Sequence, residues 1–143
     1  MTDDRIKLQV LTPEQAVLAE EVDEVVLPGE EGELGVKPGH DPLLTSLGIG
    51  EMVVSTDGEK RRFFVDRGFA EVFARQVRVL AEDCEGVEEI DVQQAREKLA
   101  EAEQEIERLE SAESEEDELL DSYRESLKKQ RRRLALSGED DES

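Results

Sequence analysis

The sequence predicts a small antiparallel β-sandwich followed by a two-helix hairpin, and three observations support this fold class. All four prolines and nine of the ten glycines lie before residue 90. Short apolar segments with period-two alternation recur in the same region, which is typical of β-strands. The rest of the chain repeats apolar residues at intervals of three and four, which is typical of amphipathic helices. We therefore expect a β-sandwich domain at 1–89, a helical hairpin at 90–136 and a disordered acidic tail at 137–143.

The first segment contains short strands separated by turns. Residues 6–10 alternate apolar and polar side chains, and Thr12-Pro13 ends this strand. Asp57-Gly58 is a strong hairpin signal, and Arg75-Gln76 marks another turn. Short strands at this close spacing, with frequent turns between them, favour an antiparallel sandwich or barrel. The expected aromatic core is thin, so docking onto a partner should add stability; it consists of Phe63, Phe64, Phe69 and Phe73.

The second segment predicts two helices. Asp91 is a good N-cap, and Gln94 three residues later completes a capping box. Residues 111–114 interrupt the pattern, and Ser114 with Asp117 reads as a second capping box. The two helices could pack on each other, or each could pack on a partner. The expected apolar stripes are Val92, Ala95, Leu99, Ala102, Ile106 and Leu109 on the first helix, and Leu120, Tyr123, Leu127 and Leu134 on the second.

The charge of the chain excludes several functions. With 39 acidic and 18 basic residues the formal net charge is −21, which opposes binding to nucleic acid and to anionic lipid. No apolar run approaches the roughly 20 residues that span a bilayer. The N-terminal residues lack the basic and apolar regions of a signal peptide. With Cys84 as the single cysteine no internal disulfide can form, and we expect a cytoplasmic location.

Residues able to carry catalysis are scarce. His40 is the only histidine and Cys84 the only cysteine, so neither a catalytic triad nor a zinc cluster is available from this chain. Gly48-Ile49-Gly50 lacks the third glycine and the following helix of a dinucleotide fingerprint. The acidic neighbours of Cys84 should raise its pKa, which disfavours a reactive thiolate. We expect no catalytic residue, no metal site and no cofactor.

A glycine- and proline-punctuated stretch carries a family resemblance. Residues 27–36 read LPGEEGELGV and residues 37–47 read KPGHDPLLTSL. Further matches are GFAEV at 68–72 and Ile90-Asp91 opening an alanine-rich helix. Over residues 4–136 the chain resembles the epsilon subunit of bacterial rotary, proton-translocating ATP synthases. One departure is Arg67, where many relatives have a glycine, and we interpret it as tolerable in a turn.

The resemblance implies a fold, partners and a role. It implies a ten-stranded sandwich that binds the gamma subunit and sits on the ring of c subunits. The two helices would fold against the sandwich or extend toward the alpha and beta subunits, where they inhibit ATP hydrolysis. Catalysis would belong to the beta subunits, so this chain is expected to be a non-enzymatic rotor subunit. It would lie at the cytoplasmic face of the cell membrane, attached through the complex.

Two groups of residues are candidate partner contacts. Glu33 and His40 lie in glycine-bounded loops, and the resemblance implies contacts of this region with the c-ring or gamma; the alternative is that both are ordinary loop residues. A basic cluster interrupts the acidic chain near the end of the second helix. Cations there can stabilise the helix end, but their number favours binding to an acidic protein surface. The cluster comprises Lys128, Lys129, Arg131, Arg132 and Arg133.

A weak nucleotide motif opens the first helix. Some bacterial relatives bind ATP through Ile/Leu-Asp-x-x-Arg-Ala, and the matching positions here are Ile90, Asp91, Gln94 and Ala95. Gln94 replaces the arginine and cannot make a charged, forked contact to phosphate. We therefore expect weak or absent ATP binding.

Two other classes of function remain open from the sequence. The chain could be a free-standing nucleotide-binding module with a helical lid, or an acidic adaptor joining two proteins. Co-purification with gamma would favour the rotor subunit over both.

Overall fold

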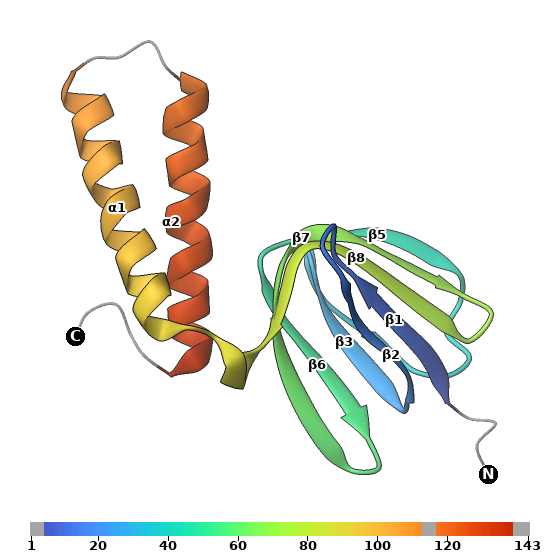
Figure 1. Cartoon of the computed structure of the whole chain (residues 1–143). Coiled ribbons are helices and arrows are strands. Elements are labelled where there is room, and N and C mark those ends of the chain that lie inside the picture. Colours follow the sequence, from blue (N-terminus) through green and yellow to red (C-terminus); the bar gives the residue numbers. More distant parts are fainter. Residues whose placement is uncertain (1–4, 113–116, 139–143) are drawn as a thin grey trace. The chain divides into compact units, whose positions relative to one another are not determined.

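The computed structural model describes residues 5–112 and 117–138. It divides into two compact units, Met1–Gly86 and Val87–Ser143. The first contains the strands and the second the helices, as the distribution of glycine and proline predicts (Figure 1).

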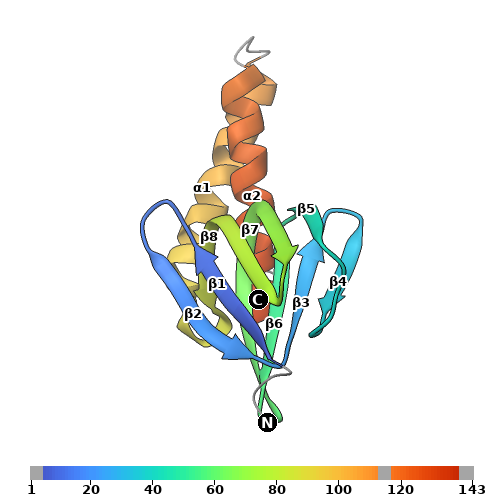
Figure 2. The ribbon, with the colours of Figure 1, turned by 90° about the vertical axis from the view of Figure 1, so that its right-hand side faces the viewer.

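Eight strands form the first unit, where the family resemblance implies about ten. In the sheet, β2 and β1 are followed by β8, β7, β5, β3 and β4, and β6 pairs with both β3 and β7 (Figure 2). β1 and β8 run parallel, while the other pairs are antiparallel. The strands are β1 (Ile6–Leu11), β2 (Ala16–Val22), β3 (Glu24–Gly29), β4 (Gly32–Val36), β5 (Leu43–Leu47), β6 (Gly50–Thr56), β7 (Glu59–Phe73) and β8 (Gln76–Gly86).

The count is lower because two long strands run through both layers of the sandwich. The first half of β7 pairs with β6, and its second half pairs with β5, in one unbroken register. The bend lies at Arg67-Gly68, opposite the Gly48-Ile49 break between β5 and β6. Strands that bend from one layer into the other form the corners of such sandwiches. Arg67, at φ +34°, therefore lies within a strand and not in the turn that the sequence predicts.

Aliphatic side chains fill the core between the layers. β1 contributes alternate residues, Ile6, Leu8 and Val10, which are at most 1% exposed, and the other strands add further buried residues. Phe63 and Phe64 are buried as expected, but Phe69 is 53% exposed, so the prediction that it belongs to the core is wrong. In the second half of β7 the buried positions are Ala70 and Val72, and this alternation places Phe69 on the outer face.

Both predicted hairpins are present. Asp57 and Gly58 have φ of +52° and +81°, as a two-residue turn requires. The β7–β8 turn lies one residue earlier than predicted, at Ala74 and Arg75, with φ of +44° and +63°. Two consecutive non-glycine residues in the left-handed region are unusual, because a Cβ atom is unfavourable there.

The second unit is a short 3₁₀ helix, η2 (Val87–Glu89), and two α-helices, α1 (Val92–Ser111) and α2 (Asp117–Ser137). The Asp91 N-cap is confirmed, because its Oδ1 accepts a hydrogen bond of 3.0 Å from the amide of Gln94. The predicted stripes pack on each other, with Leu134 of α2 buried against Ala95 and Leu99 of α1.

Two of the predictions concern the ends of the helices. The predicted second capping box includes Ser114, which lies outside the described residues. Ser137 is the last residue of α2 although the acidic tail was predicted to begin there, and residues 139–143 are not described. Within the described residues, neither helix is long and apolar enough to cross a membrane.

Candidate functional site

His40 closes a tight turn between β4 and β5. Pro38 presets the first central position and Gly39, at φ +89°, takes the second, as in a type II turn. The His40 amide donates to the Lys37 carbonyl over 3.1 Å. The ring Nδ1 lies 2.7 Å from the carbonyl oxygen of Asp41, so Nδ1 carries the proton and donates. The half-buried imidazole is thus oriented by the backbone of its own loop.

Glu33 lies near the start of β4 and not in the loop that the sequence predicts, because residues 32–36 pair with β3. It is opposite Pro28 of β3 and is exposed. Among the described residues its carboxylate makes no hydrogen bond or ion pair, and none joins it to His40. The structure therefore leaves Glu33 available for an external contact and does not combine the two residues into one site.

An exposed apolar surface, missed from the sequence, lies on the outer face of the sandwich. Phe69 is directly opposite Leu80 of β8, and these residues are 53% and 40% exposed. Leu44 of β5, at 67%, lies opposite Glu71, two residues along β7 from Phe69 and hence on the same face. We call Leu44, Phe69 and Leu80 the outer apolar patch. The alternation in the second half of β7 is the available signal, since Phe69 directly precedes the alternate buried positions Ala70 and Val72.

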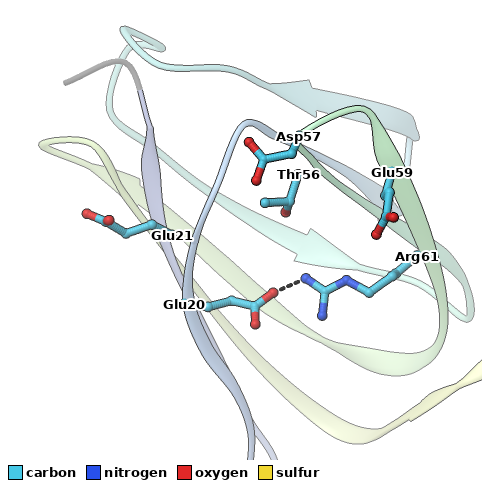
Figure 3. A pocket seen from close by; sticks show the side chains of 6 residues that line it. All are labelled: Glu20, Glu21, Thr56, Asp57, Glu59 and Arg61. Carbon is cyan, nitrogen blue, oxygen red and sulfur yellow. Dashed lines mark hydrogen bonds and ion pairs between the residues drawn. The ribbon is translucent and has the colours of Figure 1, made fainter. Parts of the chain in front are cut away.

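A shallow acidic depression of about 460 Å³ lies where β2 approaches the β6–β7 hairpin (Figure 3). The carboxylate of Glu20 pairs with Arg61 across it. The lining residues are Glu20, Glu21, Thr56, Asp57, Glu59 and Arg61. No group of three or more acidic, cysteine or histidine side chains among the described residues is arranged to hold a metal ion.

The basic cluster of α2 does not form a single exposed surface. Lys128, Arg131 and Arg132 are exposed and Lys129 is half-buried. Arg133, however, is only 4% exposed. Its guanidinium donates to Gln130 Oε1 over 2.8 Å, and at 3.4 Å to Gln94 Oε1 on α1. Arg133 therefore contributes to the packing of the helix pair. The sequence does not indicate this role, because Arg133 lies in a run of cations.

The residues that match the nucleotide motif have structural roles at the start of α1. The side chain of Asp91 caps the helix. Ile90 and Ala95 are buried. Gln94 accepts the weak hydrogen bonds from Arg133.

Cys84 lies in the core of the sandwich. Burial, followed by the nearby carboxylates of Asp83 and Glu85, raises the pKa of its thiol from 9.0 to about 12. The sequence predicts the direction from the acidic neighbours, but burial is the larger cause. A group so protonated at neutral pH is a poor nucleophile.

Comparison with known proteins gives the family. Residues 5–87 match the model of the ATP synthase delta/epsilon chain β-sandwich domain. The ATP synthase epsilon chain of Thermodesulfovibrio yellowstonii is 42% identical over 112 residues, covering 78% of this chain and 80% of the relative. That of Carboxydothermus hydrogenoformans is 46% identical over 105 residues, covering 73% and 78%.

Two solved structures share the fold. A chain of the Euglena gracilis mitochondrial ATP synthase OSCP/F1/c-ring assembly has a TM-score of 0.76 at 24% identity, covering 92% of this chain and 81% of its own. A chain of the Tetrahymena thermophila mitochondrial ATP synthase central stalk and c-ring has a TM-score of 0.53 at 17% identity, covering 60% and 69%. Together, the family model across more than half of the chain and the sequence relatives show that this chain belongs to the family of ATP synthase epsilon chains.

Proposed function

We propose that this protein is a non-catalytic subunit of the ATP synthase central stalk, which couples rotation to ATP synthesis and restrains ATP hydrolysis. Membership of the epsilon-chain family supports the complex. The central-stalk and c-ring assemblies that contain structural neighbours are consistent with that location. In this proposal the protein reaches the cytoplasmic face of the membrane only through its partner subunits.

The observation that carries the assembly role is the outer apolar patch. Leu44 and Phe69 expose more than half of their surface on the sandwich. Removing such side chains from water on binding releases about 25 cal/mol for each Å² of apolar area. Large apolar side chains grouped on one face mark a protein interface more often than isolated ones do. We assign this face to the gamma subunit, with Glu71 and Arg78 forming a polar part of the contact.

Binding to purified gamma subunit tests this assignment. Phe69→Glu should weaken binding at least tenfold, because the new carboxylate would have to lose its water in the interface. Leu119→Glu is the matched control, since Leu119 is an exposed leucine on α2. A chain lacking residues 90–143 should still bind. Equal affinities for the Phe69→Glu and control proteins would exclude this face.

For the c-ring we propose a contact through the exposed surface of β4 at Glu33 and through the turn that His40 closes. The exposed Glu33 carboxylate suits a basic or amide-bearing loop, and the protonated Nδ1 of His40 holds its ring in a fixed orientation. In assembled enzyme, Glu33→Gln should reduce coupled ATP synthesis, whereas Glu59→Gln, on the β6–β7 hairpin, should not. Indistinguishable coupling in the two variants would remove Glu33 from the contact.

We propose that inhibition of hydrolysis uses the exposed cations of α2. Lys128, Arg131 and Arg132 present positive charge to an acidic surface of the alpha and beta subunits. Each exposed pair contributes only about 0–1 kcal/mol, but several together can shift a two-state arm. Replacing these three by Ala should raise ATP hydrolysis by the assembled enzyme, and the increase should shrink as salt rises. An unchanged rate of ATP hydrolysis would show that these cations only stabilise the end of the helix.

A further inference from the structure

The outer face of one layer of the sandwich carries apolar side chains in a line that crosses the strands. β5, β7, β8, β1 and β2 are neighbours in this layer (Figure 2). In register, Ser46 pairs with Phe69, Phe69 with Leu80, Leu80 with Leu11 and Leu11 with Ala16. Residues directly opposite each other point to the same face, so these side chains form one row. We call the apolar part of it the cross-strand row: Phe69, Leu80, Leu11 and Ala16.

A β-bulge brings Ala16 to this face. The register between β1 and β2 shifts at Leu11, and β2 has one extra residue there. Val17 and Leu18 both pack against the core. This leaves Ala16 and Ala19 on the outer face, where both are exposed.

Polar residues border the row on both sides. On β8, Leu80 stands between Arg78 and Glu82. On β7, Glu71 follows Phe69 on the same face, and its Oε1 lies 3.9 Å from Nη1 of Arg78. Residues four apart on a strand, such as Arg78 and Glu82, are at most about 13 Å apart. A helix with its side chains is about 10–12 Å across, so the row has room for a single helix.

The direction of the row favours a helix over an extended strand as its partner. Along β7 the apolar surface stops at Glu71, and along β8 it stops at Arg78, so a partner that follows the row must cross the strands. Neighbouring strands are about 4.8 Å apart. Successive turns of a helix rise about 5.4 Å and therefore fall almost on successive strands. Alternate residues of an extended strand are about 6.7 Å apart and lose this match by about 2 Å at each strand.

We propose that the cross-strand row is the docking site of an amphipathic α-helix of the gamma subunit, which lies across β7, β8, β1 and β2. The inference rests on the proposed function, which assigns this face to gamma, and it adds the form and direction of the segment that binds. A cation on the flank of this helix meets Glu82, which is exposed and whose carboxylate makes no hydrogen bond or ion pair among the described residues. The net charge of −21 also favours a basic partner segment.

Cross-links from the two ends of the row report the form of the partner segment. Ser46 on β5 and Ala16 on β2 are four strand intervals apart, about 19 Å. Ser46→Cys and Ala16→Cys proteins, each with a short photoreactive label on the new thiol, are bound to purified gamma and irradiated. Cys84 is only 5% exposed and does not compete for the label. Mass spectrometry then locates the cross-linked residues of gamma.

A helix rises about 1.5 Å per residue, so the two sites on gamma should be about 13 residues apart. An extended strand rises about 3.4 Å per residue and would place them about six apart. Sites about six residues apart, or sites on two unconnected segments of gamma, would overturn the proposal.

Ala16→Gln and Ala19→Gln form a matched pair of variants, because both replace an exposed alanine on the same face of β2. Only Ala16 lies in the row, since Ala19 pairs with Gln9. Ala16→Gln should weaken binding to gamma about three- to tenfold, because its amide would lose water in an apolar contact, and Ala19→Gln by less than about twofold. Equal affinities of the two variants would overturn the proposal. If Phe69→Glu still weakens binding in that case, the face remains assigned to gamma and only the helix is excluded; if Phe69→Glu binds like the wild type, both proposals fail.

The charge of the partner is tested at Glu82. At 0.05 M salt, Glu82→Gln should weaken binding about two- to fivefold, the modest strength of an exposed pair, and the difference should vanish at 1 M. Glu21→Gln is the control, because Glu21 is an exposed glutamate of β2 outside the row. Equal binding of the two variants at low salt would exclude a basic flank on the docked helix.

Discussion

Replacing Gly68 by alanine should damage the sandwich more than any other glycine-to-alanine change on its strands. Gly68 has φ +154° at the bend of β7. A Cβ atom there would lie 1.9 Å from the carbonyl oxygen of Leu80 and 2.8 Å from Cα of Ala81. Both obstacles are backbone atoms of the paired strand, so no side-chain rotation relieves them. Relief would require β7 and β8 to separate by about 1 Å, which would break the ladder on both sides of the bend.

We expect this substitution to lower the free energy of unfolding by about 4 kcal/mol or more, a loss typical of severe steric or cavity defects. A loss of 1 kcal/mol lowers Tm by about 4–8 °C in a domain of this size, so Tm should fall by about 16 °C or more. Gly39→Ala is the control, because Gly39 also has positive φ, +89°, but no atom lies within 4 Å of the added Cβ. Its cost should be only the backbone term, about 1–2 kcal/mol. Thermal unfolding followed by far-ultraviolet circular dichroism measures both. If Gly68→Ala lowers Tm no more than Gly39→Ala does, the close approach at the bend is not real.

Four further outcomes are expected. Replacing Ala74-Arg75 by Asn-Gly should raise the free energy of unfolding by about 1–2 kcal/mol, because both residues have positive φ, and a lower Tm would contradict this. Because the pKa of Cys84 is raised to about 12, the unfolded chain loses the thiol proton above pH 9 while the folded chain retains it. The free energy of unfolding should therefore fall between about pH 9 and 12 by about 1.4 kcal/mol per pH unit. Cys84→Ala should remove this part of the slope in chemical denaturation. With a net charge of −21, the chain should show a Tm that increases with sodium chloride, and a flat or falling dependence would refute the repulsion argument. Calorimetry should detect weak or no ATP binding, because Gln94 replaces an arginine and Asp91 is engaged as a cap, and a Kd in the low micromolar range would overturn this.

The fold class could be predicted because two independent patterns in the sequence indicate it. Alternating apolar residues and Asp57-Gly58 specify hairpins, and the run without glycine or proline after Asp91 specifies helices. The number of strands could not, because Arg67 and Gly68 look like a turn in the sequence. Whether such a pair ends a strand or bends it depends on the partner strand, here β8, which continues past the bend and keeps β7 paired.

The candidate surfaces were harder to predict, since they depend on which way side chains point. Phe69 is as apolar as Phe63, and its register opposite the exposed Leu80 shows that it faces outward. Arg133 has the same charge as Arg132, yet the geometry of the helix directs Arg133 into the interface between the helices and Arg132 into solvent. The turn at His40 follows from proline and glycine chemistry, whereas Glu33 lies in a strand that its flanking glycines do not predict. The contacts of both residues to other subunits stay a prediction.

The bend shared by β7 and β8 has a mechanical consequence. In a sandwich held only by side-chain packing, the two layers can slide over each other when a sideways load is applied. Here the peptide bonds of β7 and β8 continue from one layer into the other, so the load is carried by covalent backbone. Shearing the layers would require stretching these strands or breaking their ladders. The two layers therefore resist sliding over each other, a property that the proposed role in a rotating central stalk requires.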